Sequence, residues 1–597
     1  MTLRLLSFCG LFAVVSLSGC SSGSSSGGGG TVTPPVTPAA TTTALAVSPN
    51  PAPAASTVTL VATVTSSSGT PTGSVTFYDG TTSLGTITLS SGVATLAVTT
   101  FAASSTHSLD ATYSGAGSTF AASTSSAVSL TIQAAVQPIT ITATANLSFT
   151  TPNQTIAGFG AAEAFDLNDL DNHPNETAIM KALFDPVAGL GLTFLRVQNL
   201  YYQYTGTNGT QFDLDTPKIV TAANAAHGTP LQIEMSAWSP PASIKSNSSV
   251  NNGGTLNMVS GGYNYAGYAQ FWYNSLQAYA ALGVVPSYIS LQNELDFTAT
   301  YASCRFDPSE DSTYAGYDKA LAAVYTQIQA LTSPPKIIGP ESFSTVNLLS
   351  YASVVEGEPL QSSEIYALGH HLYNVSSTST NPAAPDTGLT ALQNMATAYP
   401  TQNKWMTEYF DQPGFFTAWN MHNALAVGND SAYFYWGLTW PSATVANGQA
   451  TDQQGLIYID SPFNAQSTWA FPSGWAYNDS YYAFKHFSYF VLPKYVRYNA
   501  TITPTSNTDE RVSVYQGTNP STNRPTTVIV AMNVSTTVTD GLLLSAGTLP
   551  AYTSSAVYRS TFSQPITTGE RWDNLGSYTS NGISMPPQSV VTIVLND

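Results

Sequence analysis

Strand-like and helix-like segments alternate through the middle of this 597-residue chain, and this alternation limits its possible folds more than any other feature. Eight segments are rich in strand-forming residues: 155–161, 193–198, 231–239, 288–294, 336–342, 365–373, 404–409 and 432–438. Helix-like stretches separate them, among them 175–188, 217–226, 265–282, 314–331, 389–398 and 417–427. Strands that alternate with helices form parallel sheets, and eight such units match a closed barrel in number and length. We therefore expect the α/β fold class, with a (β/α)8 TIM barrel over residues 156–489.

Two of the expected strands end in a glutamate. Glu294 ends the run that begins at Ser290, and Glu408 ends the run that begins at Lys404. In a parallel barrel the catalytic groups come from the C-terminal ends of different strands, so these two side chains can face each other across one cleft. Paired carboxylates of this kind are typical of a hydrolase. We therefore predict Glu294 and Glu408 as the catalytic residues.

Both flanks of the expected barrel carry β patterns. Between residues 42 and 133, short alternating runs are separated by Gly, Asp and Ser turns at the spacing of a β-sandwich. The last hundred residues return to strand patterning at 495–503, 512–515, 527–531, 555–558 and 590–594. A strand pair at 139–144 and 147–151 would be marginal alone. We expect 138–155 and 490–597 to form one side β-sandwich domain.

The N-terminus has the pattern of an export signal. Arg4 precedes an apolar run over 5–17, and Leu17-Ser18-Gly19-Cys20 follows. This motif resembles a bacterial lipobox, which implies a signal over 1–20, lipid attachment at Cys20 and a place in the bacterial cell envelope, at the outer membrane or cell surface. An ordinary cleaved secretory signal is the alternative. Residues 21–41 are Ser/Gly-rich and then Thr/Pro-rich, the composition of a flexible linker.

Charge and cysteine content limit the partners. Lys and Arg number 16 against 34 Asp and Glu, for a formal net charge of −18. This balance argues against nucleic acid, which needs basic residues, whereas a polar surface with 33 tyrosines suits a neutral polysaccharide. Once Cys9 and Cys20 are assigned to the signal, Cys304 has no disulfide partner, which excludes a cysteine metal or redox site. We expect a monomer without metal or cofactor.

Five motifs together resemble glycoside hydrolase family 30 of clan A, a group of β-xylanases, β-1,6-glucanases and glucosylceramidases. They are Gly158-Phe-Gly, Trp238-Ser-Pro-Pro-Ala, Gln292-Asn-Glu, Trp405-Met-Thr-Glu and Tyr482-Ala-Phe-Lys-His-Phe-Ser-Tyr-Phe-Val. The resemblance covers residues 139–597 and implies a barrel with a side β-domain built from both ends of the catalytic region. It also implies a retaining double displacement, with Glu294 as acid/base and Glu408 as nucleophile. Residues 42–133 resemble bacterial Ig-like repeat modules, especially at Gly73 to Asp79 and at Thr112-Tyr-Ser-Gly115. This resemblance implies a spacer or stalk and, as the alternative, a carbohydrate-binding module.

Further residues are predicted to contact the substrate. Asn293 is expected to donate a hydrogen bond to the sugar 2-hydroxyl, a bond that strengthens in the transition state. A buried Arg196 on the second strand would hold the nucleophile ionised and oriented; a salt bridge elsewhere is the alternative. Three aromatic side chains are expected to serve as sugar platforms or, alternatively, to pack in the core: Trp238, Tyr373 and Trp436.

Two adjacent histidines lie near the expected end of the sixth strand, in Gly369-His370-His371-Leu372-Tyr373. Neighbours on a strand point to opposite faces, so these two cannot chelate one metal together. We expect His371 to face the cleft and His370 to be structural. We expect this motif, Gly158-Phe-Gly and the Trp238 motif all to lie at C-terminal strand ends. Five other acids are expected to bind backbone, pair with arginine or face solvent: Glu163, Glu234, Asp296, Glu341 and Asp411.

Departures from the family pattern bear on the substrate. Asn293-Glu294 is followed by Leu295 where the family usually has proline, which changes the loop but not the chemistry. Glucuronoxylan-cleaving members look like Tyr-Trp followed by a pair of arginines, but Tyr435-Trp436 is followed by Gly-Leu-Thr-Trp440, without a cation. This difference argues against dependence on an acidic side group. Residues 442–475, rich in Asn, Gln and aromatics, are expected to shape the cleft for a neutral glycan.

The sequence therefore predicts an exported, retaining β-glycoside hydrolase for a neutral plant or microbial polysaccharide, most similar to a β-1,4-xylanase. A β-1,6-glucanase, a galactanase or a glucosylceramidase-like enzyme is the alternative within the family. A non-catalytic carbohydrate-binding surface protein on a degenerate barrel, or a stalk or adhesin, is the alternative from another class. The intact glutamate pair argues against both.

Overall fold

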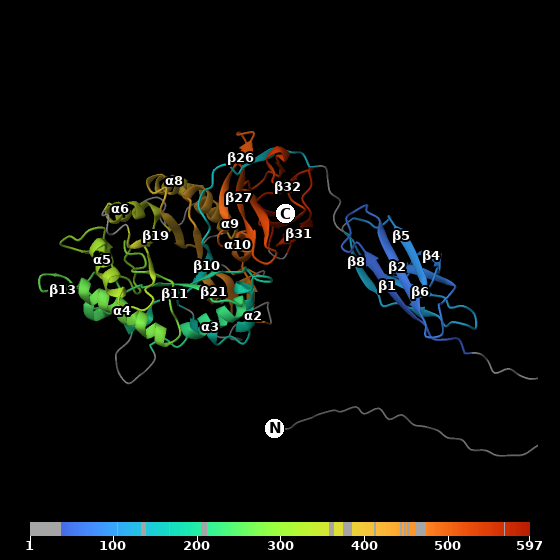
Figure 1. Ribbon diagram of the computed structural model, residues 1–597, viewed down its shortest axis with the longest axis horizontal. Helices are drawn as coiled ribbons and strands as arrows, with labels where there is room; N and C mark the ends of the chain where they lie inside the picture. The colour runs from blue at the N-terminus through green and yellow to red at the C-terminus, as the bar shows by residue number, and fades with distance from the viewer. Residues whose placement is uncertain are drawn as a thin grey trace, which may run out of the picture. The chain divides into compact units, whose positions relative to one another are not determined.

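The computed structural model describes residues 37–103, 105–132, 139–165, 167–203, 212–357, 363–373, 385–410, 413–441, 445–446, 449–450, 454–460, 473–565 and 568–597. The chain divides into two compact units, one before and one after residue 138 (Figure 1). The predicted signal, Cys20 and most of the predicted linker lie outside the described residues. No helix among the described residues is long and apolar enough to span a membrane.

The first unit contains two antiparallel sheets. One has the order β1-β2-β5, and the other runs β4-β3-β6-β7 with β8 also paired to β6. Their strands are β1 (Thr42–Ser48), β2 (Val58–Thr65), β3 (Ser74–Asp79), β4 (Thr82–Thr88), β5 (Val93–Val98), β6 (Thr106–Tyr113), β7 (Ser123–Thr124) and β8 (Val128–Thr131). Alternate side chains along β2, such as Val58, Leu60 and Ala62, are fully buried in the shared core. This alternation is why the sequence pattern predicted a sandwich.

The second unit contains the predicted barrel. Its eight parallel strands are β10 (Gly158–Glu163), β11 (Phe194–Gln198), β12 (Gln232–Ser236), β15 (Tyr288–Ser290), β18 (Lys336–Ile338), β19 (Ile365–His371), β20 (Asn403–Glu408) and β21 (Ala432–Pro441). The last strand pairs in parallel with the first, which closes the ring and confirms the fold prediction. Strands β24 (Gly455–Ile459) and β25 (Trp475–Tyr477) extend the sheet from β21. Such strands are covered on both faces, so they read as apolar runs.

Helices follow the barrel strands and cover them (Figure 1). They are α1 (Leu167–Asp171), α2 (Glu176–Phe184), α3 (Thr216–His227), α4 (Tyr265–Ala281), α5 (Tyr317–Ile328), α6 (Thr345–Val355), α8 (Leu389–Ala398), α9 (Phe415–His422), the π-helix η4 (Asn423–Gly428) and α10 (Asp479–Ser488). Side-chain caps begin three of them: Asn264 accepts from Gly267, Ser344 from Asn347, and Asn478 from Ser480.

The Gly158-Phe-Gly motif begins the first barrel strand, so the prediction that it lies at a C-terminal strand end is wrong. A Cβ atom on Gly160 would lie 2.7 Å from the Phe194 Cβ atom, and Gly158 has a φ of +146°. Phe194 packs against Trp405 and Phe434 inside the barrel, with ring centroids 5.1 and 5.2 Å away. The two glycines therefore make room for an aromatic plug at the end of the barrel opposite the glutamates.

A nine-stranded sheet forms the rest of the second unit, in the order β31-β30-β33-β28-β27-β26-β9-β29-β32. Its strands are β9 (Ala143–Ser148), β26 (Val496–Thr503), β27 (Glu510–Asn519), β28 (Arg524–Asn533), β29 (Asp540–Leu544), β30 (Ser554–Thr561), β31 (Asp573–Gly576), β32 (Ile583–Met585) and β33 (Ser589–Asn596). The sequence predicted two strands at 139–144 and 147–151, but the single strand β9 runs between β26 and β29. Ala143, Ala145 and Leu147 alternate into the core without a turn between them.

Helix α10 connects the barrel to this sheet. His486 contacts the Thr592 and Ser560 hydroxyls at 2.8 and 2.9 Å. Burial lowers the pKa of His486 to about 3, so the ring is neutral and its two nitrogens fit one donor and one acceptor.

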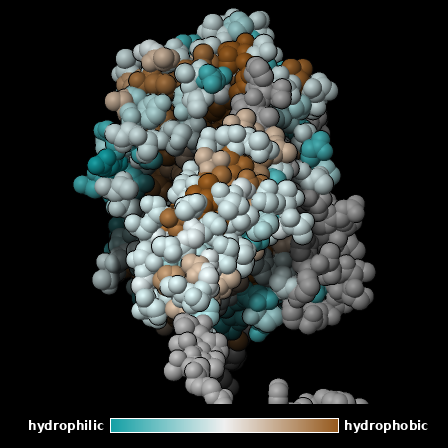
Figure 2. Space-filling view, turned by 90° about the vertical axis from the view of Figure 1, so that its right-hand side faces the viewer, coloured by the Kyte–Doolittle hydropathy of each residue, from teal (hydrophilic) through white to brown (hydrophobic). Residues whose placement is uncertain are grey.

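Charged residues make up only 8% of the chain, and the face in Figure 2 accordingly shows few strongly hydrophilic residues.

Candidate active site

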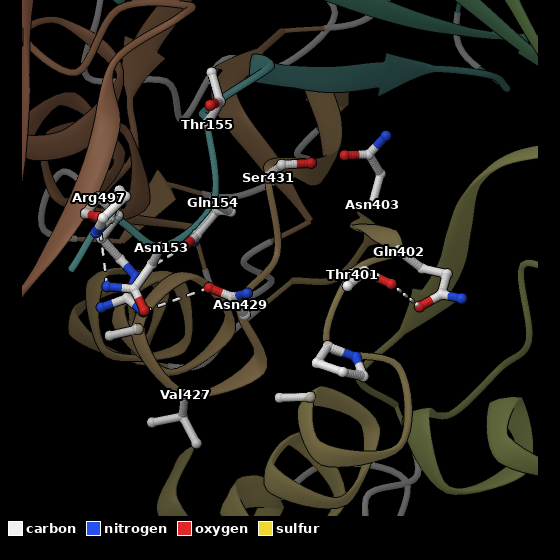
Figure 3. Close-up of a pocket in the computed structure, with 14 residues that line it drawn as sticks. Asn153, Gln154, Thr155, Thr401, Gln402, Asn403, Val427, Asn429, Ser431 and Arg497 are labelled. Carbon is white, nitrogen blue, oxygen red and sulfur yellow. Dashed lines mark hydrogen bonds between the residues drawn. The ribbon is translucent and has the colours of Figure 1, made fainter.

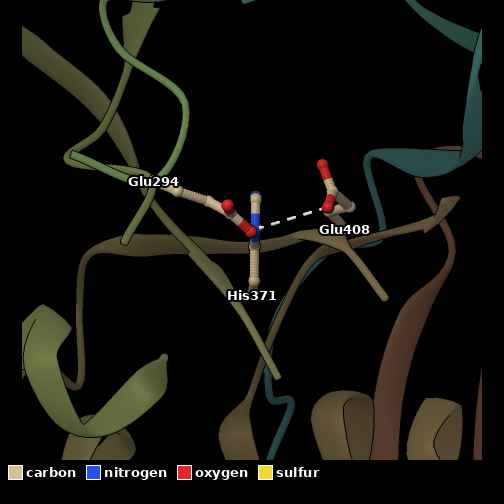
Figure 4. Close-up of side chains that lie close together, drawn as sticks. All are labelled: Glu294, His371 and Glu408. Atoms are coloured by element: carbon tan, nitrogen blue, oxygen red, sulfur yellow. Dashed lines mark hydrogen bonds and ion pairs between the residues drawn. The ribbon is translucent and has the colours of Figure 1, made fainter. Parts of the chain in front are cut away.

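Two glutamates from distant strands meet at the C-terminal end of the barrel. Glu294 lies just beyond β15, and Glu408 is the last residue of β20. One carboxylate oxygen of each, together with a ring nitrogen of His371, lie within 4.8 Å of one another. Figure 4 shows the two carboxyl groups approaching His371 from opposite sides. Both glutamates are buried.

His371 lies between the acids. Its Nδ1 atom is 3.2 Å from Glu294 Oε1 and 3.8 Å from Glu408 Oε1, and its Nε2 atom is 3.7 Å from Glu341 Oε1. The adjacent His370 points elsewhere and pairs with Asp430 at 3.1 Å. The structure thus places His371 at the glutamates and His370 away from them.

Arg196, from β11, organises the floor of the site and is fully buried. Its Nη1 atom lies 2.8 Å from Glu408 Oε2, and its Nη2 atom donates to Asn293 Oδ1 at 2.7 Å. The same guanidinium contacts two further acids, Glu341 at 3.1 Å through Nη2 and Glu234 at 3.1 Å through Nε. One arginine thereby ties β11 to residues at or near the ends of four other barrel strands.

The charges of this cluster divide the acids into two kinds. Burial raises the pKa of Glu294 to about 7, although hydrogen bonding to His371 opposes the shift. Burial and the Glu341 charge also hold the pKa of Glu234 well above its usual range. For Glu341, burial is outweighed by Arg196 and His371, which lower the pKa to about 2. For His371, burial is outweighed by Glu408 and Glu294, which raise the pKa to about 10.

These shifts leave Glu294 able to hold a proton near neutral pH, a few ångströms from Glu408, which is bonded to an arginine. Two carboxyl groups with such different surroundings can act as a proton donor and a nucleophile. A divalent metal fits poorly at Glu294, His371 and Glu408, because a protonated imidazole is not a ligand and Arg196 already carries a positive charge there.

Backbone conformation at two of the glutamates departs from the usual. Glu294 has a φ of +49° and Glu341 a φ of +54°, both in the left-handed region. The Glu294 amide donates to the Glu341 carbonyl at 3.1 Å, and the Ser236 hydroxyl donates to Glu341 Oε2 at 2.6 Å. Such conformations cost about 1–3 kcal/mol each and persist where surrounding contacts hold them. Here the contacts aim the Glu294 side chain at His371.

The predicted aromatic platforms differ in how accessible they are. Trp238 is only 2% exposed, with the Arg196 guanidinium 4.8 Å from its ring centre. Trp436 and Tyr373 are also buried. Tyr373 packs on Phe343 at 5.3 Å, and burial with the Glu408 and Glu294 charges raises its pKa. Tyr373 therefore lies beside Glu294 and Glu408, whereas Trp238 packs against Arg196.

Two accessible aromatics near the pair were not predicted. Phe165 is 47% exposed and contacts Trp238 and Trp436, with ring centroids 5.9 and 5.6 Å away. Tyr301, 45% exposed, lies 6.1 Å from Phe165, and the Glu294 and Glu408 charges contribute to raising its pKa. Phe165 could have been predicted from the sequence, because it lies two positions past the first barrel strand. The loop that carries Tyr301 has no sequence feature that predicts its place near the glutamates.

Three other residues named in the sequence analysis can be placed. Glu163 accepts from the Thr439 backbone amide at 3.3 Å, and Asp296 accepts from the Phe343 amide at 2.7 Å. Cys304 is buried. Asp411 and most of the segment 442–475 lie outside the described residues.

Both units are similar to known proteins. Residues 45–133 match the family model of the bacterial Ig-like domain (group 3). The second unit is similar to glycoside hydrolases of family 30. The glucuronoxylanase XynC of Bacillus subtilis is 25% identical over 377 residues, which cover 60% of this chain and 73% of that protein.

Solved structures share the barrel and its side sheet. The catalytic domain of xylanase C of family 30 from Talaromyces cellulolyticus has a TM-score of 0.57 at 19% identity, over 76% of this chain and 100% of that one. The subfamily 8 xylanase of Clostridium acetobutylicum gives 0.54 at 23%, with the same coverage. An endo-β-1,6-glucanase gives 0.55 at 18%, over 78% of this chain and 97% of that one. The predicted resemblance is thereby confirmed.

Proposed function

We propose that this chain is an exported glycoside hydrolase that cleaves β-linked polysaccharide with retention of configuration. The observation that carries the proposal is the approach of Glu294, His371 and Glu408 within 4.8 Å, with Arg196 bonded to Glu408. Retaining enzymes hold their carboxyl groups about 5–5.5 Å apart, and inverting enzymes about 6.5–9.5 Å apart. One oxygen of each carboxyl group therefore lies nearer to the other acid than the separation typical of inverting enzymes, which supports the retaining mechanism.

In the first step the Glu408 carboxylate attacks the anomeric carbon while Glu294 donates its proton to the departing oxygen. The raised pKa of Glu294 keeps that proton available near neutral pH. Asn293 accepts from Arg196 through its Oδ1 atom, which fixes the amide orientation and turns its NH2 group away from the guanidinium. That NH2 group is the donor proposed for the sugar 2-hydroxyl.

In the second step Glu294 acts as a base and removes a proton from the water that hydrolyses the glycosyl enzyme. Glu294 is then a carboxylate between transfers, and the protonated His371, 3.2 Å away, stabilises that charge. Arg196 performs the corresponding task when Glu408 is released. Glu294 therefore has His371 as its nearest cation, whereas Glu408 has Arg196 at 2.8 Å and His371 at 3.8 Å.

The proposed substrate is a neutral glycan, with β-1,4-xylan first and β-1,6-glucan second. Phe165 and Tyr301 offer accessible ring faces of the kind on which sugars stack. The XynC relative acts on glucuronoxylan, as its name states, and a β-1,6-glucanase shares the fold. In the present chain, Trp436 is followed by neutral residues through Trp440, so the site has no cation there for a glucuronate.

Hydrolysis of a panel of substrates tests the proposal. Purified protein would be incubated with xylan, glucuronoxylan, β-1,6-glucan, β-1,3-glucan and arabinogalactan, and the released reducing sugar measured. Proton NMR of the first product distinguishes retention from inversion. We expect release from xylan or β-1,6-glucan, with no preference for glucuronoxylan and a β-anomer formed first. An α-anomer at the earliest time points rejects the double displacement, and no release from any substrate rejects the hydrolase.

The proposed location is the bacterial cell envelope, through a lipid on Cys20, with the Ig-like unit as a spacer and the chain as a monomer. Labelling of cells with an alkynyl fatty acid tests the anchor. We expect the wild-type chain to be labelled and Cys20→Ser to be unlabelled and released into the medium. Equal labelling of both forms would assign the lipid elsewhere.

A further inference from the structure

A pocket of about 580 Å³ lies at the end of the barrel opposite the catalytic pair. It is lined by the segment before β10, the segment before β20, the end of η4 and the start of β26. The first three lie at the N-terminal ends of the barrel strands β10, β20 and β21, and β26 belongs to the side sheet, whereas Glu294 and Glu408 lie at the C-terminal end of the barrel. The pocket is therefore separate from the proposed hydrolytic site.

Arg497 forms one wall of this pocket and is only 6% exposed. Its Nε atom donates to Gln154 Oε1 at 2.8 Å, and its terminal nitrogens donate to Asn499 Oδ1 at 3.2 Å and Asn429 Oδ1 at 3.4 Å. All of these acceptors are neutral. No aspartate or glutamate among the described residues forms an ion pair with Arg497.

An uncompensated buried arginine is costly, because burying a charge without an opposite charge loses most of its hydration energy. The chain shows how it compensates other arginines: Arg196, Arg511, Arg559 and Arg571 each have a carboxylate within 3.1 Å. Arg497 instead faces a space large enough for a small ligand. A ligand with a carboxylate would supply the missing charge.

The rest of the lining narrows the class of ligand. Figure 3 shows Arg497, Asn153, Gln154 and Asn429 together on one side of the pocket, and Thr401, Gln402 and Asn403 on the other. Amide and hydroxyl groups suit the hydroxyls of a sugar, and none of the described lining residues is acidic. A phosphate would usually meet several cations or a helix N-terminus, and the lining has one arginine.

We propose that this pocket binds a uronic acid unit of an acidic oligosaccharide, with the uronate carboxylate paired to Arg497 and the ring hydroxyls bonded to the surrounding amides. The site would hold an acidic glycan without cleaving it, at a place remote from the glutamate pair. The inference stands apart from the proposed hydrolysis, because it rests on no residue of the catalytic site.

Isothermal titration calorimetry of the full chain tests this binding at pH 7 and low salt. The probe is α-1,4-linked digalacturonate, whose linkage a β-glycosidase does not cleave. Galactobiose with the same linkage is the neutral control, and inorganic phosphate tests for a general anion site. We expect digalacturonate to bind at least tenfold more tightly than either control.

Three variants test whether the heat of digalacturonate binding comes from this pocket. Arg497→Gln removes the charge, and Ala396→Phe fills the pocket from α8 without touching the Arg497 hydrogen bonds. Arg524→Gln removes an exposed arginine on β28 and is the charge control. We expect the first two to weaken digalacturonate binding at least tenfold and the third to change it less than twofold.

The proposal is overturned if wild-type protein gives no heat with digalacturonate, or if Ala396→Phe and Arg497→Gln bind it as wild type does. Phosphate that binds as tightly as digalacturonate also overturns it, because the pocket would then recognise charge and not a sugar acid. If Arg497→Gln does not fold, Ala396→Phe decides, since it leaves the arginine in place.

Discussion

Arg196 Nη1 lies 2.8 Å from Glu408 Oε2 inside the barrel, although the two residues come from the second and seventh strands. The contact joins two charged groups in a buried place, so it is stronger and more directional than a surface ion pair. Its other N–H groups hold Asn293, Glu234 and Glu341. Arg196 is therefore a single support on which the orientation of the proposed nucleophile and its neighbour depends.

Replacing Arg196 is expected to affect stability and activity in different proportions. Arg196→Ala removes the guanidinium from three buried carboxyl groups, and breaking a buried pair costs about 3–5 kcal/mol of unfolding free energy. Arg196→Lys keeps the charge but loses the fork that reaches Glu408 and Asn293 together. We expect the lysine variant to fold yet lose about 100-fold or more in kcat, consistent with loss of an electrostatic support.

Denaturant unfolding and kinetics on the best substrate measure the two effects. Arg524→Gln, at an exposed arginine, is the control and should change neither. If Arg196→Lys kept the wild-type kcat, a positive charge alone would be sufficient for activity at this position.

Substitutions of Glu294 and Glu408 are expected to impair hydrolysis in different ways. Glu294→Ala should slow cleavage of a polysaccharide by about 10²–10⁴-fold, the usual contribution of a general acid. An aryl glycoside with a good leaving group needs no proton, so its first step should be spared. Glu408→Gly should abolish hydrolysis of both substrates, because no glycosyl enzyme forms.

Sodium azide distinguishes the roles further. Azide should replace the missing base in Glu294→Ala and give a β-glycosyl azide, and should attack in place of Glu408 in Glu408→Gly and give the α-anomer. If Glu294→Ala gave the α-glycosyl azide and Glu408→Gly the β-glycosyl azide, Glu294 would be the nucleophile and Glu408 the acid/base. Unchanged hydrolysis by Glu408→Gly would remove Glu408 from the mechanism.

The pH dependence of activity is expected to follow the Glu294 proton. With a pKa of about 7, Glu294 loses that proton as the pH rises, so kcat/KM should fall about tenfold per unit above pH 7. Hydrogen bonding to His371 lowers the pKa of Glu294, because the imidazolium favours the carboxylate form. Replacing His371 by Asn removes that effect and should move the alkaline limb to higher pH.

The adjacent histidine provides a matched control for this shift. His370 pairs with Asp430 and makes no ion pair with Glu294. The alkaline limb of the kcat/KM profile of His370→Asn should therefore lie at the same pH as that of the wild type. Profiles of kcat/KM from pH 4 to 10 measure all three proteins. A limb that moves to lower pH in His371→Asn contradicts the assignment of His371 as the group that favours the ionised acid.

Much of the fold followed from the sequence because its elements have strong local patterns. Barrel strands such as β21 are buried over most of their length and therefore read as apolar runs. The same pattern located Glu294 and Glu408 at strand ends, since a parallel barrel brings those ends together. The strand positions needed no knowledge of the distant partners.

Other features depend on contacts that local patterns do not contain. The sharing of Arg196 among Glu234, Glu341 and Glu408 requires that three more strands point their side chains inward at one level. Tertiary contacts hold the backbone of Glu294 in the left-handed region. Because this position is not a glycine, the sequence gives no sign of that conformation. Gly158 looked like a functional glycine, but the crowding by Phe194 that explains it becomes visible only when the strands are paired.

A buried acid in the side sheet gives a last prediction, concerning stability. Glu510, on β27, is 4% exposed, and neither of its carboxyl oxygens has a hydrogen-bond partner among the described residues. Burial, with the Asp540 charge, raises its pKa to about 9. In the unfolded chain a glutamate loses its proton near its ordinary pKa of about 4.3. The proton that the folded protein retains therefore favours folding at low pH, and this contribution is lost as the pH rises toward 9.

Glu510→Gln should remove this pH dependence, because an amide cannot ionise in either state. We expect variant and wild type to be similar at pH 4, and the variant to be more stable by up to about 5 kcal/mol at pH 8, at about 1.4 kcal/mol per pH unit above the unfolded pKa. All nine tryptophans lie after residue 139, so tryptophan fluorescence during guanidinium unfolding reports only on the unit that contains Glu510. Glu570→Gln is the control, since Glu570 is paired with Arg559 at 2.5 Å and its loss should bring no gain at pH 8. A stability difference between Glu510→Gln and wild type that is the same at pH 4 and pH 8 would mean that Glu510 does not retain its proton in the folded protein.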